Sequence, residues 1–111
     1  MTLQTATTNA SQRLQTLARL YRGGQASDLM DRTLHKLLSY ETEVSRTQLS
    51  QLEVDLAEFE QRYGLSSTEF YHRYRAGQTD DRMDYVEWAS LIQMADNLRR
   101  RLKILAAEDQ S

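Results

Sequence analysis

The sequence contains no cysteine and no proline, and only four of its 111 residues are glycine. Without cysteine there is no disulfide, no thiolate metal site and no cysteine nucleophile. Without proline, and with so few glycines, almost nothing interrupts long helices. These absences favour an all-α fold.

Long apolar runs and strong charge are also missing. No stretch approaches the roughly 20 apolar residues that span a bilayer, and the N-terminus lacks the basic start and apolar core of a signal peptide. We therefore expect a cytoplasmic protein with no membrane partner. The net charge of −2 argues against an electrostatic grip on nucleic acid by the whole molecule, although it leaves room for a local basic patch.

Residues that carry chemistry are scarce. The two histidines, His35 and His72, lie far apart and neither has a partner at metal-ligand spacing. The acidic cluster Asp80, Asp81 and Asp84 lacks the spacing of a calcium-binding loop and is better explained as a helix start. No serine lies in a nucleophile motif and no glycine-rich loop has a phosphate-binding pattern. We predict no metal, no cofactor and no enzymatic activity, and a protein that works by binding.

Apolar spacing and capping residues predict four helices. A short first helix begins at Asn9 or Ser11 and ends near Arg22, before Gly23-Gly24. The segment before it, Met1–Ala10, is expected to be a disordered terminus. The alternative there is a short strand over Thr2–Thr8, because threonine is β-branched. Three more helices are predicted: a long one over 27–62, a short one over 67–75 that begins with a capping box, and one from Asp81 or Asp84 to Ala106.

The long helix raises a question of size. Unbroken, it measures about 50 Å, more than the roughly 35 Å breadth of a compact domain of this length. It must project, pair with another copy or break, and the weakest stretch is Ser39–Ser50, where Glu41 lies in the apolar seam. We expect a continuous or kinked helix that pairs in a homodimer. The dimerisation residues are predicted to be Leu34, Leu37, Leu38, Leu52 and Phe59.

Aromatic residues are concentrated in the two C-terminal helices. A nine-residue helix with three rings exceeds what one thin stripe can bury, so we expect part of the set to form core and the rest to form a partner surface. The predicted organisation is a helical dimerisation region over 1–50 and a partner-binding module over 51–111. The predicted partner-binding residues are Phe70, Tyr71, Tyr74, Asp84, Tyr85 and Trp88.

The segment Leu52–Leu102 resembles the C-terminal half of antitoxin subunits from bacterial toxin–antitoxin operons. The resemblance is carried by Tyr63-Gly64-x-Ser66-Ser67-x-Glu69-Phe70-Tyr71, by Gly77, and by Asp84-Tyr85-x-Glu87-Trp88-Ala89. It implies a protein that binds and neutralises a cognate toxin protein.

The N-terminal half has a fainter resemblance to the ribbon-helix-helix fold of many antitoxins. That likeness implies a strand whose Gln4 reads DNA bases and a second helix whose start, near Ser27, holds a phosphate. The strand segment carries no basic residue and no Leu-Pro, so DNA is the secondary expectation and dimerisation the first. Two alternatives remain open: a DNA-binding autorepressor, and a non-catalytic helical adaptor whose aromatic residues are all core.

Overall fold

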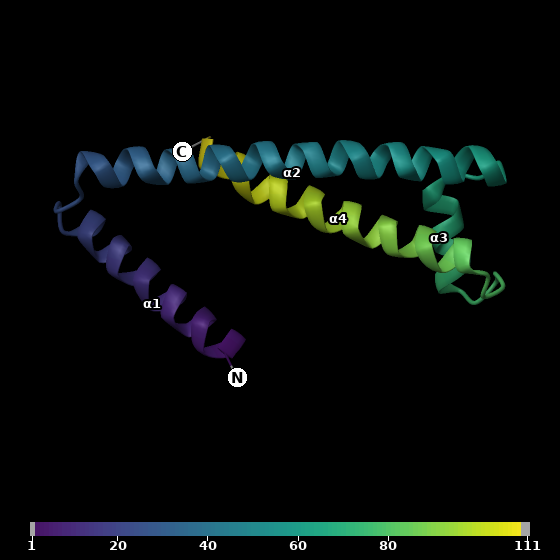
Figure 1. Ribbon diagram of the computed structural model, residues 1–111, viewed down its shortest axis with the longest axis horizontal. Helices are drawn as coiled ribbons and strands as arrows, with labels where there is room; N and C mark the ends of the chain where they lie inside the picture. The colour runs from purple at the N-terminus through teal and green to yellow at the C-terminus, as the bar shows by residue number, and fades with distance from the viewer. Residues whose placement is uncertain (1, 110–111) are drawn as a thin grey trace. The chain divides into compact units, whose positions relative to one another are not determined.

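The computed structural model describes the backbone of residues 2–109 and the side chains of residues 9–107, and it consists of four helices. These are α1 (Thr2–Arg22), α2 (Asp28–Tyr63), α3 (Ser67–Arg75) and α4 (Met83–Asp109) (Figure 1). The predicted all-α fold is confirmed, and no strand occurs in the described backbone. The alternative strand at Thr2–Thr8 is replaced by the first turns of α1. A lone strand would leave its N–H and C=O groups unpaired, whereas a helix pairs them internally.

Ser27 and Ser66 cap α2 and α3 as predicted, whereas α1 begins at Thr2 and not at the predicted Asn9 or Ser11. Ser27 Oγ accepts a hydrogen bond from the backbone N–H of Met30 at 3.1 Å, and Ser66 Oγ accepts one from Glu69 at 3.1 Å. The Glu69 carboxylate accepts from Arg73 at 3.0 Å instead of completing the capping box, and Glu60 of α2 accepts the N–H of Ser67 at 2.8 Å. The start of α3 is thereby fixed to the end of α2.

Glycine ends α2 and α3. Gly64 and Gly77 have φ angles of 62° and 72°, a left-handed conformation that glycine adopts without strain. The next residue then donates back to the helix: Leu65 N–H reaches the Glu60 carbonyl at 3.3 Å, as Gln78 N–H reaches that of Arg73 at 2.9 Å. The chain turns sharply at both points.

The described chain forms two compact units that meet between Leu37 and Leu38, whereas the regions drawn from the sequence meet at residue 50. The N-terminal unit holds α1 and the first turns of α2, and the Tyr21 hydroxyl donates to Asp31 Oδ1 at 2.6 Å. From Asn9 to Leu37 none of its side chains is buried. The most exposed apolar residues are Leu14, Leu29 and Leu37, at 62%, 65% and 53%.

The C-terminal unit holds the rest of α2 with α3 and α4. The α4 helix runs back alongside α2, and the short α3 lies between them where they splay apart (Figure 1). All buried apolar residues of the described chain are in this unit, because only here do three helices enclose a core. They are Leu52, Leu56, Phe59, Phe70, Trp88, Ala89, Ile92 and Ala95.

The long helix is continuous from Asp28 to Tyr63, as one of our two expectations had it. The polar stretch in its middle does not break it, because α4 packs there. Glu41 forms an ion pair and hydrogen bond with Arg101 of α4, and Ser45 is 2% exposed. A charge in the apolar seam is therefore matched by a charge on the neighbouring helix.

Candidate functional site

The predicted partner-binding residues divide by burial. Phe70 and Trp88 are 1% and 0% exposed, and their rings stack at 3.9 Å with planes 2° apart. The Trp88 indole N–H donates to Ser67 Oγ at 2.9 Å, so its one polar atom is satisfied internally. These two residues are core, which corrects the expectation that they lie on a partner surface: no partner reaches a side chain that its own helices enclose.

The three tyrosines of the same set are half-buried. The rings of Tyr74 and Tyr85 both pack against Phe70, with centroids 5.6 and 5.3 Å away. Tyr71 faces another direction: its hydroxyl accepts a hydrogen bond from Gln93 Nε2 of α4 at 3.0 Å. Hydrogen bonds from Gln93, and then from Arg75, lower the pKa of the Tyr71 hydroxyl. Each tyrosine thus has one side on the core and one side open to solvent.

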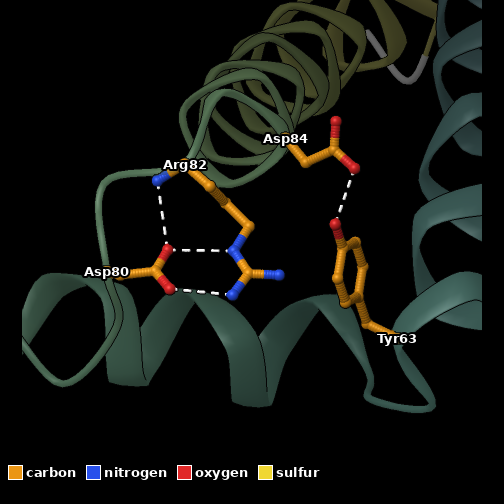
Figure 2. A network of polar contacts seen from close by, with 4 residues as sticks. All are labelled: Tyr63, Asp80, Arg82 and Asp84. Atoms are coloured by element: carbon orange, nitrogen blue, oxygen red, sulfur yellow. Dashed lines mark hydrogen bonds and ion pairs between the residues drawn. The ribbon is translucent and has the colours of Figure 1, made fainter.

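The turn between α3 and α4 is held by an acid–guanidinium pair. Asp80 accepts two parallel hydrogen bonds from the Arg82 guanidinium, at 2.9 and 2.8 Å, and a third from the Arg82 backbone N–H at 3.1 Å (Figure 2). The Arg82 side chain holds the pKa of Asp80 down from its ordinary 3.8 to about 2. This turn is therefore ordered although its side chains are exposed.

A second acid ties the start of α4 to the end of α2. The Tyr63 hydroxyl donates to Asp84 Oδ2 at 2.6 Å (Figure 2). Arg62 Nη1 donates to the same oxygen at 2.9 Å. These two bonds, that of Tyr63 first, lower the pKa of Asp84, and the bond to the carboxylate raises the pKa of Tyr63. Arg82 lies over the Tyr85 ring at 4.6 Å from its centroid.

Sequence reasoning named Asp80 and Asp84 but missed the side chains that pair with them. Arg62 and Tyr63 end one helix and Asp84 begins another, and 21 or 22 residues separate them. Nothing in the spacing links them, because helix period describes one helix and not its neighbour. The one available signal was Asp80, which lies two residues before Arg82 and so at the spacing of a side-chain turn.

Three residues of this network, Tyr63, Asp80 and Tyr85, line an open hollow at the α3–α4 turn, which we call the turn hollow. Its volume is about 540 Å³, and its walls include Tyr63, Tyr85, Arg73 and Asp80. Aromatic faces beside carboxylates suit a guanidinium or ammonium group, and Arg82 already lies over one such face. Both carboxyl pKa values are lowered, so neither Asp80 nor Asp84 is poised to donate a proton near neutral pH.

A separate groove of about 420 Å³ runs between α2, α3 and α4 beside Tyr71. It is lined on α2 by Glu53 and Glu60, and Glu53 is paired with Arg99 of α4 at 3.5 Å. The groove and the turn hollow are different openings with different linings. The tyrosines of the predicted surface are thus distributed between them, since Tyr71 lines one and Tyr85 the other.

The predicted dimerisation residues also divide. Leu52 and Phe59 are buried in the chain's own core, where Phe59 stacks on Trp88 at 5.6 Å, so they are not available to a partner. This corrects the dimer seam, because α4 of the same chain covers that stretch of α2. Leu34 and Leu38 are half-buried and Leu37 is 53% exposed.

The predicted DNA contacts are not supported by their surroundings. The Ser27 hydroxyl caps α2, and Asp28 and Asp31 occupy the first turn of that helix, where they repel a phosphate. The Gln4 side chain lies outside the described residues, and the backbone there is helical. The strand on which the DNA-reading expectation rests is absent from this segment.

Three further findings bear on function. Within residues 2–109, no helix is long and apolar enough to cross a membrane. The described side chains include no group of three or more His, Asp or Glu that could hold a metal ion. Comparisons with protein-family models, with curated proteins and with solved structures gave no match.

Proposed function

We propose that this chain is an antitoxin-like bacterial protein that binds and neutralises a cognate toxin protein in the cytoplasm. The observation that carries the proposal is the turn hollow, an exposed opening bordered by the acidic segment from Gln78 to Glu87 and held in shape by internal bonds. The segment from Gln78 to Glu87 carries four carboxylates and one guanidinium, a net charge of −3. A partner with a basic surface suits it.

Pre-ordering of the turn favours binding. The bidentate Asp80–Arg82 pair and the Tyr63–Asp84 bond fix the turn before any partner arrives. Less conformational freedom is then lost on association. Tyrosine rings supply large contact area with few rotatable bonds, and for this reason they are frequent at binding hot spots. The open sides of Tyr74 and Tyr85 have this character.

The test is co-expression with the product of the neighbouring gene. We expect that product to arrest growth alone, and this chain to restore growth and to be captured with it. Tyr85→Ala should weaken capture about tenfold or more, whereas Val54→Ala, at an exposed α2 position, should leave it unchanged. Failure of the neighbouring product to bind rejects the proposal. Binding without any toxicity favours the alternative, a non-catalytic helical adaptor.

DNA-binding autoregulation is a second candidate, favoured by charge in the N-terminal unit. Residues 1–37 contain five basic side chains against Asp28 and Asp31, a net charge of +3 in a chain of net charge −2. Operator binding should fall steeply as salt rises, because cations on the protein displace condensed counterions. A flat or absent signal at low salt rejects this candidate. The basic side chains are Arg13, Arg19, Arg22, Arg32 and Lys36.

Self-association is the third part of the proposal. The N-terminal unit has no buried side chain from Asn9 to Leu37 and exposes several leucines, and a chain of this size gains stability when such surface is covered. We expect a homodimer, detected as twice the mass of one chain by light scattering. A single-chain mass over the whole concentration range would contradict it.

A further inference from the structure

The solvent side of α4 carries a regular seam, here called the α4 outer face. Its members recur at alternating steps of four and three residues, the spacing of a coiled-coil seam, and all seven are exposed. Three of them, Met83, Met94 and Ile104, have long apolar side chains that are 79%, 51% and 75% exposed. The members are Met83, Glu87, Ser90, Met94, Asn97, Arg101 and Ile104.

This seam is additional to the face that α4 already buries. Trp88, Ile92 and Ala95 form the core side of the helix. A helix that only covers a core carries charged residues on its other side, but here methionine and isoleucine occupy it at matching turns. The α4 helix therefore carries long apolar side chains on its solvent side as well as on its core side.

A groove adjoins the seam. It lies between α2 and α4 in the C-terminal unit and has a volume of about 470 Å³. Met94, Asn97 and Arg101 of the α4 outer face form part of one wall, and Gln48 and Leu52 of α2 form part of the other. Its only charged lining residue, Arg101, is already paired with Glu41. Apolar groups, amides and a neutralised charge are the composition of a surface that becomes buried.

The charges on the seam identify what covers it. Glu87 lies seven residues before Met94, and Arg101 lies seven residues after it. A second α4 laid antiparallel and centred on Met94 brings each Glu87 opposite an Arg101, whereas a parallel arrangement opposes like charges. The same alignment sets Met83 against Leu105 and beside Ile104. The pattern is complementary to itself, as a two-fold symmetric interface requires.

We infer that a second copy of this chain docks antiparallel on the α4 outer face, centred on Met94. The inference rests on the self-association part of the proposed function and adds to it a contact surface in the C-terminal unit. Met94 packs beside the partner's Met94, and the exposed part of each side chain enters the groove of the other copy. Arg101 has five N–H donors, so one guanidinium can bridge its own Glu41 and Glu87 of the partner subunit.

The first experiment measures the mass and the dissociation constant of the full-length chain by sedimentation over a wide concentration range. The wild type should be a dimer. Met94→Glu should raise the dissociation constant about tenfold or more, while the matched control Val54→Glu, at a position 54% exposed on α2, should not change it. Circular dichroism checks that both variants fold. Ser90→Arg, at an exposed polar position of the seam, provides a second disruption without loss of an apolar side chain.

The second experiment exchanges the charges. Glu87→Arg alone should weaken the dimer, and Glu87→Arg combined with Arg101→Glu should restore much of the affinity, because opposite charges face each other again. A wild-type monomer up to about 100 µM overturns the inference, as does a dimer that neither Met94→Glu nor Ser90→Arg weakens, or a charge exchange that restores nothing. Toxin capture by Met94→Glu is measured separately, so loss of this surface is distinguished from loss of the proposed function.

Discussion

Trp88 is the residue on which the C-terminal unit depends most. Its ring packs against Phe59 and Tyr63 from the last turns of α2 and against Phe70 of α3, and its indole N–H donates to Ser67. One side chain therefore holds three helices together. Packing alone accounts for such a residue, and its position says nothing by itself about binding.

Trp88→Ala should lower the free energy of unfolding by about 3–5 kcal/mol, because it removes a large buried ring and leaves a cavity. Urea denaturation followed by circular dichroism measures it. The control is Val86→Ala on the same helix, where a 44% exposed side chain should cost within about 0.5 kcal/mol. A Trp88→Ala variant that keeps wild-type stability but loses partner binding would contradict the assignment of Trp88 to the core.

The acids of the turn predict a pH dependence of stability. The pKa of Asp80 is lowered from 3.8 to about 2, and that of Asp84 is also lowered. A carboxyl group whose pKa is lower in the folded chain than in the unfolded chain stabilises the fold. This stabilisation is complete when the pH is above the unfolded-state pKa, and it is lost as the pH falls through the folded-state pKa. The thermal midpoint should therefore fall between about pH 4 and pH 2. This decline should be flatter in Asp80→Asn/Asp84→Asn.

Asp81→Asn is the matched control for that experiment, since Asp81 is an exposed carboxylate in the same turn. It should follow the wild-type profile. An identical decline in the double variant and the wild type would show that other carboxylates set the acid stability.

At the scale of the elements, helix periods and most helix ends can be predicted from the sequence, although α1 begins at Thr2 and not at Asn9 or Ser11. Which helices are neighbours cannot be predicted in this way. Ser27 and Ser66 cap as predicted because capping needs only residues within one turn. The spacing correctly predicts that the face with Leu52 and Phe59 is buried. The prediction that a second copy buries this face is wrong, because α4 of the same chain does so. A 3.6-residue period states that a face is buried and contains nothing about which helix buries it.

Gly64 offers a test of a helix end. Its φ of 62° strains any side chain, and a Cβ added there meets no atom within 4 Å, so the backbone alone sets the cost. Gly64→Ala should destabilise the chain by about 1–2 kcal/mol. Gly64→Asn should cost less, because asparagine tolerates this conformation. Equal unfolding free energies for the two variants would show that the strain is not of this origin.

At the scale of the whole molecule, the two units differ in both packing and charge. Every buried apolar side chain of the described residues lies beyond Leu38, and the N-terminal unit from Asn9 onward buries none. The N-terminal unit carries a net charge of +3, and residues 38–111 carry −5. The charge difference between the two units can be read directly from the sequence. The packing difference cannot be predicted from the sequence, because α1 has as regular an apolar stripe as the helices that contribute to the core.

A fragment of residues 38–111 should therefore fold alone. It keeps all three helices that enclose the core, including the Glu41–Arg101 ion pair at the far end of α4. Its thermal unfolding, followed by circular dichroism, should remain cooperative with a midpoint near that of the full chain. The matching fragment 1–37 should show little helix, since short helices without a packed face are marginal in water. A non-cooperative 38–111 fragment would mean that the N-terminal unit supplies stability that its exposed side chains do not account for.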